Sequence, residues 1–306
     1  MRSLVIGACG FLGRSLTREL SRRHQHVRTM DTSPVVPTGS ADHVHSDALS
    51  SDCLHHALND VDVVYNFIGT SVPSSGLKSL QDELKANTHY IVKLVDSAAD
   101  HGVRKIVFPS SGGTVYGDSD TDETLHRETD PLEPRSVYAL GKVLGETTLK
   151  FYCLERRIGS LIVRISNPYG NKNPPAHAQG VVDHFVHRIL CGKPLEIWGD
   201  GECIRDFIYI DDVVKAVVDL AERPATEPET YNIGSGIGST VNEVAKLLQD
   251  HFGVLKVSHR EAPAPLLHRN VLCTAHLRDA LPNWKPRLLR QGIADFVTDL
   301  GSTQPY

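Results

Sequence analysis

The sequence predicts an α/β fold in which a Rossmann-type, doubly wound parallel sheet is followed by a smaller α/β lobe at the C-terminal end. Apolar, β-branched runs alternate with stretches of helical periodicity through about residue 165, as in parallel sheets whose strands are joined by helices. The first apolar run, Leu4-Val5-Ile6, leads through a glycine-rich turn directly into a helical stretch. After Asn167-Pro168 the alternation loosens into Pro- and Gly-rich segments, which indicates the second lobe.

The individual elements follow from the same alternation. Strands are expected at residues 2–6, 26–30, 42–45, 61–67, 105–110 and 160–165. Helices are expected at residues 11–22, 49–58, 76–101 and 136–157. The chain is expected to rejoin the first sheet near 207–223 and 230–233. The first domain would therefore comprise residues 1–168 plus about 207–233, and the smaller lobe about 169–206 plus 234–306.

The composition of the chain argues against several classes of protein. Its 306 residues are 40% hydrophobic and 23% charged with a net charge of −5, which is ordinary for a globular enzyme and gives no support for nucleic-acid binding. No run reaches the ~18 apolar residues that a membrane span requires, and Met1-Arg2 leads straight into the first strand, so no signal peptide is expected. Six cysteines without a C-x-x-C pair fit reduced thiols in a cytoplasmic protein. The histidines show no metal-binding pattern, so no metal site is expected.

The glycine turn after the first strand predicts a dinucleotide-binding site. Gly7 allows a tight turn, Gly10 lets the backbone approach a pyrophosphate, and Gly13 lets the helix pack closely on the strand. Free N–H groups at the start of the helix then face the anion, and Phe11 and Leu12 belong to this expected site. The alternative is a βα turn that merely needs glycine.

The second strand ends at Asp31, which indicates the kind of cofactor. A carboxylate at this position accepts hydrogen bonds from the ribose hydroxyls and repels a 2′-phosphate, and no basic residue immediately follows it, so NAD is favoured over NADP. Asp47-Ala48 comes after the third strand, where the adenine edge is usually bound. An equally good alternative for Asp47 is a helix N-cap near Leu49.

Tyr138 and Lys142 are four residues apart, so on a helix they share one face. An ammonium group close to a phenol favours the phenolate and lowers its pKa from about 10 toward the working range. Such a base can remove the proton of a sugar hydroxyl while hydride leaves the same carbon. The pair indicates this chemistry because it lies downstream of the glycine turn; a Y-x-x-x-K pattern alone would be a weak indication.

At this point the chain resembles the extended short-chain dehydrogenase/reductase family, and within it the nucleotide-sugar epimerases similar to UDP-glucose 4-epimerase. The resemblance rests on an ordered series of motifs that covers nearly the whole chain. The series comprises GACGFLG (7–13), VVYNFIG (63–69), Asn87, SSGGTVYG (110–117), YALGK (138–142), RISNPYG (164–170), IWGDGECIRDFIYIDD (197–212), YNIGSG (231–236) and Asn283-Trp284-Lys285-Pro286.

The resemblance adds further cofactor-binding residues to those predicted from the glycine turn. It implies that Lys142 also holds the nicotinamide ribose. The further residues that it implies for NAD binding are Phe67, Ile68, Gly69, Asn87, Ser110, Tyr138, Lys142 and Pro168.

One departure from the family pattern concerns the catalytic hydroxyl. The family commonly has serine or threonine where this chain has Gly112. Because strand side chains alternate, Thr114 would share the face of position 112, which makes it the first candidate for the missing hydroxyl. Ser111 is the second candidate, if the two glycines break the strand. The acids that family dehydratases carry at about Gly113 and Thr114 are absent, which argues against dehydration.

The expected sugar-nucleotide site lies in the second lobe. By resemblance, Asn167 donates to the diphosphate, with a turn role before Pro168 as the alternative. Arg205 and Arg260 could clamp the same diphosphate with their guanidinium forks. Trp198 is expected either to stack on a uracil or to pack in the core of the lobe. The residues expected to line the same pocket are Gln179, Gly180 and Val181.

Together these features predict NAD-dependent epimerisation at C4 of a UDP-hexose through a transient 4-keto sugar. The alternatives are another reaction on the same scaffold, namely dehydration, reduction or decarboxylation of a nucleotide sugar, and a non-catalytic NAD-binding regulator. The family resemblance also implies a homodimer in which helices 82–101 and 138–157 form a four-helix bundle. Val143 and Leu144 are the candidate contact residues, with packing on the sheet as the alternative.

Overall fold

The structure is a computed structural model that describes residues 1–48, 51–69, 80–119, 121, 123–171, 180–224, 227–262 and 267–302. The chain forms two compact units. Unit 1 comprises residues 1–115, 131–164 and 214–231, and unit 2 comprises residues 116–130, 165–213 and 232–306.

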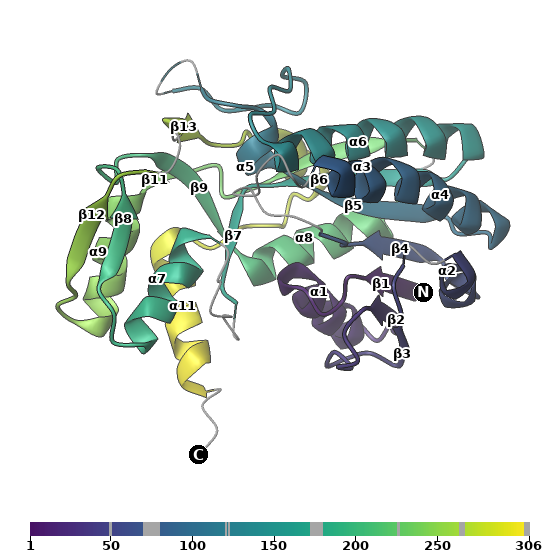
Figure 1. Cartoon of the computed structure of the whole chain (residues 1–306), viewed down its shortest axis with the longest axis horizontal. Coiled ribbons are helices and arrows are strands. Elements are labelled where there is room, and N and C mark those ends of the chain that lie inside the picture. Colours follow the sequence, from purple (N-terminus) through teal and green to yellow (C-terminus); the bar gives the residue numbers. More distant parts are fainter. Residues whose placement is uncertain are drawn as a thin grey trace. The chain divides into compact units, whose positions relative to one another are not determined.

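A seven-stranded sheet forms the centre of unit 1 (Figure 1). Its strands are β1 (Arg2–Ile6), β2 (His26–Asp31), β3 (Asp42–His45), β4 (Val63–Asn66), β5 (Lys105–Ser111), β6 (Gly159–Ile165) and β10 (Glu229–Ile233). They are ordered β10-β6-β5-β4-β1-β2-β3, and the pairings from β5 through β3 are parallel. This order, which reverses direction at β1, is that of the Rossmann fold. The predicted fold class is therefore confirmed.

Helices cover both faces of this sheet. The helices on one face are α2 (Ser51–Leu58), α4 (Tyr90–Asp100) and α6 (Val137–Arg156), and their apolar side chains form one core with β1, β5 and β6. Figure 1 shows α4 and α6 side by side above the sheet, with α1 (Phe11–Arg22) and α8 (Ile210–Glu222) below it. The strands read as continuous apolar runs because both of their faces are buried.

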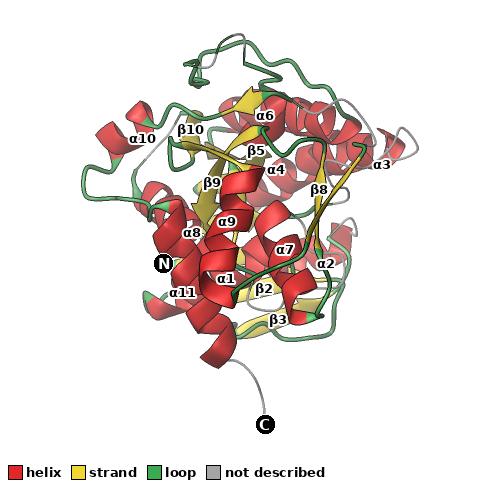
Figure 2. Cartoon of the chain, turned by 90° about the vertical axis from the view of Figure 1, so that its left-hand side faces the viewer, coloured by secondary structure: helices red, strands yellow, loops and turns green. Residues whose placement is uncertain are grey.

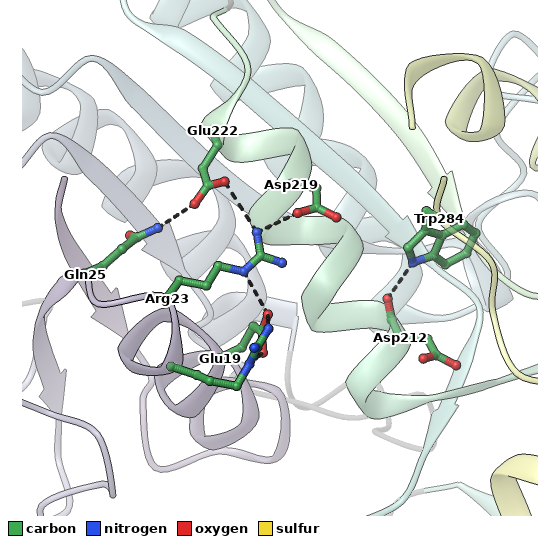
Figure 3. Close-up of polar contacts among 8 residues, drawn as sticks. Glu19, Arg23, Gln25, Asp212, Asp219, Glu222 and Trp284 are labelled. Carbon is green, nitrogen blue, oxygen red and sulfur yellow. Dashed lines mark hydrogen bonds and ion pairs between the residues drawn. The ribbon is translucent and has the colours of Figure 1, made fainter. Parts of the chain in front are cut away.

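A polar network joins α1 to α8 within unit 1 (Figure 3). The guanidinium group of Arg23 donates to Glu19 at 2.8 Å and to Asp219 at 2.5 Å, while the Gln25 amide donates to Glu222 at 2.7 Å. These contacts fix the helix that begins at the glycine turn against the far end of α8.

The helix expected over residues 76–101 is interrupted. Residues 76–79 lie outside the described part of the chain, and the remainder consists of α3 (Leu80–Leu84), a π-helical turn at Lys85–His89 and then α4. A π turn adds one residue to the helical repeat without ending the helix, so the apolar periodicity does not reveal it. Asn87, an expected cofactor residue, lies on this turn.

Unit 2 contains two smaller sheets. Strands β7 (Asn167–Tyr169), β9 (Ile204–Tyr209), β11 (Gly238–Thr240) and β13 (Arg269–Asn270) form one of them, and β8 (Leu195–Trp198) pairs with β12 (Val257–Arg260) in the other. The sequence had suggested that the chain rejoins the first sheet from residue 207 onward. Residues 207–209 instead belong to β9, in a sheet of unit 2. Their apolar pattern marks a strand but does not tell which sheet receives it. The helices of unit 2 are α7 (Val181–Leu190), α9 (Val241–Phe252), α10 (Ala275–Ala280) and α11 (Leu289–Ser302) (Figure 2).

Residues 116–130 group with unit 2, although the expected boundaries placed them in the first domain. The Tyr116 hydroxyl donates to Asn232 at 2.6 Å, and the ring of Tyr116 stacks on His126. The backbone of His126 in turn bonds to Val271 and Cys273. These contacts hold the segment that follows β5 within unit 2.

The segment before α11 is tied to the start of α8 (Figure 3). Trp284 Nε1 donates to the Asp212 carbonyl at 3.0 Å. The guanidinium group of Arg287 donates to the Asp212 carboxylate at 2.8 Å. Within the described residues, no helix is long and apolar enough to cross a membrane.

Candidate active site

The glycine turn has the geometry that its spacing predicted. Gly7 has a φ of +77°, and a Cβ atom there would come 2.5 Å from the Phe67 carbonyl oxygen. A Cβ atom at Gly13 would collide with the Gly7 carbonyl, so α1 starts directly on the turn. Gly10 is the N-cap of α1 and offers no side-chain acceptor to the first N–H groups of the helix. The turn therefore presents backbone donors at a helix N-terminus, with Phe11 and Leu12 in its first turn.

Asp31, at the end of β2, is hydrogen-bonded to the backbone of this turn. One carboxylate oxygen accepts from the Cys9 backbone N–H at 2.8 Å, and the other accepts from the Ser33 backbone N–H at 2.9 Å. The carboxylate is thus held next to the glycine turn, where a ribose could donate to its remaining lone pairs.

The loops after β3 and β4 carry the other expected cofactor residues of this edge. Asp47 is exposed, whereas Ala48 is buried in the core beneath the sheet edge. Helix α2 begins at Ser51, and Leu49 lies outside the described residues, so the choice between adenine contact and N-cap for Asp47 stays open. Phe67 donates its backbone N–H to Ile6, which sets Phe67 and Ile68 beside Gly7, and Gly69 follows them in the chain.

Two adjacent serines end strand β5. Ser110 is buried, and its hydroxyl has no hydrogen-bond partner among the described residues. The Ser111 hydroxyl lies close enough to the Tyr138 phenol to lower the pKa of that phenol. A buried, unpaired hydroxyl costs stability unless a ligand or water completes it, so Ser110 fits a cofactor-binding role.

The strand argument for Thr114 does not hold. Strand β5 ends at Ser111, and residues Gly112–Val115 form a helical turn. Period-two alternation therefore stops before Thr114, whose hydroxyl donates to the Ser111 carbonyl at 3.4 Å. The two glycines break the strand, and this break leaves Ser111, the second candidate, beside Tyr138.

Tyr138 and Lys142 lie on the first turns of α6, which the Ser136 side chain caps by accepting from Ala139 N at 3.1 Å. Lys142 Nζ lies 5.8 Å from the centre of the Tyr138 ring and 4.9 Å from that of Phe108. The predicted sharing of one helix face is therefore observed.

The electrostatics of the pair differ from the simple expectation. Burial raises the pKa of Tyr138, the nearby Ser111 hydroxyl lowers it, and the charge of Glu83 raises it. Burial also lowers the pKa of Lys142 to about 8. The expected lowering of the phenol pKa by Lys142 is therefore wrong for the ligand-free protein, because desolvation dominates at both groups.

Two glycines of α6 let buried polar groups approach this helix. A Cβ atom at Gly141 would collide with Glu83 Oε2, and one at Gly145 would come 2.6 Å from the Phe108 ring and 3.3 Å from Asn87. Asn87 Nδ2 donates to Glu83 Oε2 at 2.9 Å. The glycine in the YALGK motif thus has a packing cause that the sequence did not reveal.

A buried ion pair anchors the same helix to the sheet. The Arg164 guanidinium group donates to Glu146 with two nitrogens, Nε at 3.0 Å and Nη2 at 2.7 Å, and both side chains are almost fully buried. Glu146 lies one turn after Lys142, so this pair fixes the register of α6 against β6.

In unit 2, the structure brings Asn167 and Arg205 onto neighbouring strands. Asn167 Nδ2 donates to the Asp206 carbonyl at 3.0 Å, and the Arg205 guanidinium group donates to the carbonyls of Ile204 and Leu267 at 2.8 Å. Pro168 lies at the centre of β7.

Trp198 and Arg260 form a second group in unit 2, on the facing strands β8 and β12. The Arg260 guanidinium group pairs with Glu196 at 2.6 Å, and Trp198 is 51% exposed, which contradicts its alternative role in the core of the lobe. Gly180 and Val181 start helix α7, with a φ of +84° at Gly180. Gln179 lies outside the described residues.

Three buried residues near Tyr138 and Lys142 escaped the sequence patterns: Glu83, Glu146 and Phe108. Each comes from an element that is distant in sequence or from a helix position outside a known motif. One sequence pattern could have indicated a buried functional residue, namely a charged residue within the apolar face of a helix. Glu83 fits this pattern.

The comparisons with known proteins place this site in a family. Residues 3–234 match the model of the NAD dependent epimerase/dehydratase family. The chain is 31% identical over 314 residues to a UDP-glucose 4-epimerase of Mycolicibacterium smegmatis, with 97% of each chain covered. It is 32% identical over 310 residues to a dTDP-4-dehydro-6-deoxyglucose reductase of Escherichia coli, covering 97% of this chain and 96% of the relative.

A solved structure agrees with these relatives. The UDP-glucose 4-epimerase of Thermotoga maritima with UDP-glucose superimposes with a TM-score of 0.88 over 99% of each chain, at 26% identity. The chain therefore belongs to the NAD dependent epimerase/dehydratase family. It is an NAD-dependent enzyme of the nucleotide-sugar epimerase type, which confirms the family and the cofactor that the motifs implied.

The residues of unit 1 fit NAD as its cofactor. The uncapped N-terminus of α1 can receive a pyrophosphate, Asp31 can receive ribose hydroxyls, and the unpaired Ser110 hydroxyl is available to a ligand. The described residues contain no group of three or more His, Cys, Asp or Glu side chains that could hold a metal ion.

Proposed function

We propose that this protein interconverts the C4 epimers of a UDP-hexose through a transient 4-keto sugar. The observation that carries the proposal is the grouping of Ser111, Tyr138 and Lys142 at the end of β5 in a family of NAD-dependent epimerases and dehydratases. The absence of acids at Gly113 and Thr114 supports epimerisation over dehydration.

Each side chain has a defined task in this reaction. Tyr138 removes the proton of the C4 hydroxyl through its phenol oxygen and returns it when the ketone is reduced. Ser111 donates a hydrogen bond to the sugar oxygen as charge develops there. Lys142 would hold the nicotinamide ribose. NAD, when bound, would supply the hydride acceptor, and its positive nicotinamide ring would favour the phenolate, which the buried phenol of ligand-free Tyr138 does not favour by itself.

The division of labour between the units is part of the proposal. Unit 1 holds NAD through the glycine turn, Asp31 and Ser110, and unit 2 binds the nucleotide sugar. Arg205 and Arg260 would donate to the diphosphate, and the half-exposed Trp198 would stack on uracil. Asn167 would add a donor to the same diphosphate.

The experiment that tests this function is product analysis by NMR. UDP-glucose, UDP-N-acetylglucosamine and UDP-glucuronate are each incubated with the protein and NAD. The proposal predicts a C4 epimer of at least one of them without net formation of NADH, because hydride returns to the sugar in each cycle. Loss of water or of CO2 would instead indicate a dehydratase or a decarboxylase.

A reductase is the second candidate, because one relative at 32% identity is a dTDP-4-dehydro-6-deoxyglucose reductase. A reductase consumes one reduced cofactor for each ketone. Stoichiometric loss of NADH absorbance with a 4-keto sugar, and no epimerisation of UDP-hexoses, would favour this reaction.

The assembly proposed is a homodimer formed by α4 and α6. Val143 and Leu144 are half-buried, whereas α6 exposes Leu140, Phe151 and Leu154. An exposed apolar helix face suits a four-helix bundle with a second copy.

We also propose a cytoplasmic location, which the six free cysteines support.

A further inference from the structure

The loop that follows β2 helps to orient the Asp31 carboxylate. One oxygen of this carboxylate accepts from the Cys9 backbone N–H, and the other accepts from the Ser33 backbone N–H. The Ser33 N–H belongs to the Thr32–Ser33 peptide, and a trans peptide is planar, with its carbonyl oxygen and its N–H pointing in opposite directions. A group that holds the Thr32 carbonyl therefore also holds the N–H that reaches Asp31.

His45, on the edge strand β3, holds that carbonyl. Strand β3 pairs with β2 in parallel, and its register sets His45 opposite Asp31. The imidazole Nε2 lies 3.0 Å from the Thr32 carbonyl oxygen. Because a carbonyl oxygen can only accept, Nε2 carries the proton in this contact. The imidazole, the Thr32–Ser33 peptide and the Asp31 carboxylate thus form one chain of hydrogen bonds, in which each donor polarises the next.

His43 holds the next carbonyl of the loop. Its Nε2 lies 3.0 Å from the Ser33 carbonyl oxygen, and its Nδ1 lies 2.8 Å from the hydroxyl of Thr29, the residue opposite it on β2. Since Nε2 is again the donor, Nδ1 of the neutral ring accepts from Thr29. The Thr29 side chain is fully buried, and its hydroxyl also lies 2.7 Å from that of Ser40. These contacts hold the His43 ring in one orientation.

The loop has few other means of keeping one shape. Residues 32–41 form neither helix nor strand, so they lack the regular backbone hydrogen bonds of such elements. The conformation of such a segment depends on side chains that satisfy its backbone groups. The two histidines do this at consecutive carbonyls, directly after the residue that ends β2.

We propose that His43 and His45 are positioning residues that fix the Thr32–Ser33 peptide and, through it, the Asp31 carboxylate for the ribose hydroxyls of NAD. The inference rests on the NAD-binding role given to Asp31 in the proposed function. The histidines act on the peptide that orients Asp31 and need no contact with the cofactor. Loss of either ring frees that peptide, so that binding must also order the carboxylate, which lowers the affinity for NAD.

A double-mutant cycle tests the proposal through the dissociation constant of NAD, measured by isothermal titration calorimetry after bound NAD has been removed. We expect His45→Leu to raise this constant about fivefold, the effect of one neutral hydrogen bond, and to have no further effect in Asp31→Ala. His43→Leu should behave alike. His45→Gln, whose amide can donate in place of Nε2, should restore most of the affinity. His26→Leu, exposed at the start of β2, is the control and should bind NAD like the wild type.

Hydrogen exchange of the Ser33 amide gives a second readout that needs no ligand. His45 is exposed at the sheet edge, so its replacement does not open the core. In the ligand-free protein, His45→Leu should make this amide exchange faster, and His26→Leu should not. An exchange rate equal to that of the wild type would show that the peptide is held without the imidazole, and would overturn the proposal.

The binding data separate failure of the proposal from failure of the role of Asp31. An unchanged dissociation constant in His45→Leu, beside a raised one in Asp31→Ala, would overturn the proposal and leave that role standing. Equal effects of His45→Leu with and without Asp31 would also overturn it, because the ring would then act by another route. If Asp31→Ala binds NAD like the wild type, both the role and the proposal are wrong, whereas C4 epimerisation is judged separately by product analysis.

Discussion

The end of strand β5 shows how one local backbone change reassigns a side chain. Regular alternation through position 114 would have brought Thr114 to the face of the missing hydroxyl. Gly112 and Gly113 instead begin a helical turn, and the hydroxyl beside Tyr138 is that of Ser111. Glycine can adopt extended and helical backbone conformations at little steric cost. The sequence therefore does not predict whether Gly112 and Gly113 continue the strand or begin a helical turn.

We therefore expect Ser111→Ala to lower kcat by roughly a hundredfold, because a donor to the developing oxyanion is lost. Thr114→Val should remain within about threefold of the wild type, since among the described residues its hydroxyl bonds only the Ser111 carbonyl. Steady-state kinetics with the same nucleotide sugar check both variants. An inactive Thr114→Val beside an active Ser111→Ala would restore the alternation argument.

The lowered pKa of Lys142 predicts a specific pH dependence of stability. The folded protein releases this proton at about 8, whereas the unfolded chain holds it up to 10.5. Between these values the unfolded state binds more protons, so the free energy of unfolding rises with pH by up to about 3 kcal/mol. Denaturant unfolding of the wild type and of Lys142→Met at pH 7.5 and 10 measures the difference. Parallel behaviour of the two proteins would show that Lys142 titrates normally.

At the element scale, a buried lysine of the sheet holds the end of a helix. Lys105 on β5 donates to the carbonyls of Leu220, Ala221 and Arg223 at the C-terminus of α8. The last carbonyls of a helix have no partners within the helix, and a cation there also complements the helix dipole.

Lys105→Met is expected to lower the free energy of unfolding by about 2–3 kcal/mol, because three carbonyls at the C-terminus of α8 lose their donor. Lys93→Met, at an exposed position on α4, is the matched control and should change stability by less than about 0.5 kcal/mol. Chemical denaturation monitored by circular dichroism gives both values. Equal effects of the two substitutions would contradict a capping role.

The elements also show what sequence patterns can and cannot predict. Strands β1, β3 and β5 and helices α1 and α6 were predicted to within a residue, because each is an apolar or amphipathic run with clear ends. The π turn before α4 was missed because one inserted residue barely alters the periodicity. Glu83 was missed because its importance comes from a contact with α6 about sixty residues later in the chain.

At the scale of the whole molecule, the described residues form two units. The sequence predicted only in part which residues belong to each unit. The fold class of the main sheet followed from the alternation of strands and helices. The sheet that receives residues 204–209 did not, and neither did the grouping of residues 116–130 with unit 2. Both depend on long-range pairing, which local patterns do not encode.

The proposed assembly makes a prediction at this scale. Phe151 and Leu154 are 65% and 55% exposed on α6, so the double variant Phe151→Ser/Leu154→Ser should be monomeric while the wild type is a dimer. Val254→Ser, at an exposed apolar position of unit 2, is the control and should not change the mass. Light scattering at micromolar concentration measures the three proteins. A monomeric wild type would exclude the dimer.

The central claim is that hydride leaves C4 and returns to the same carbon within one active site. UDP-glucose deuterated at C4 tests it most directly, when it is incubated with the protein and NAD and the products are analysed by NMR and mass spectrometry. The account predicts UDP-galactose that retains deuterium at C4, with no net NADH. An epimer carrying hydrogen at C4, or no epimer from any UDP-hexose, would contradict it.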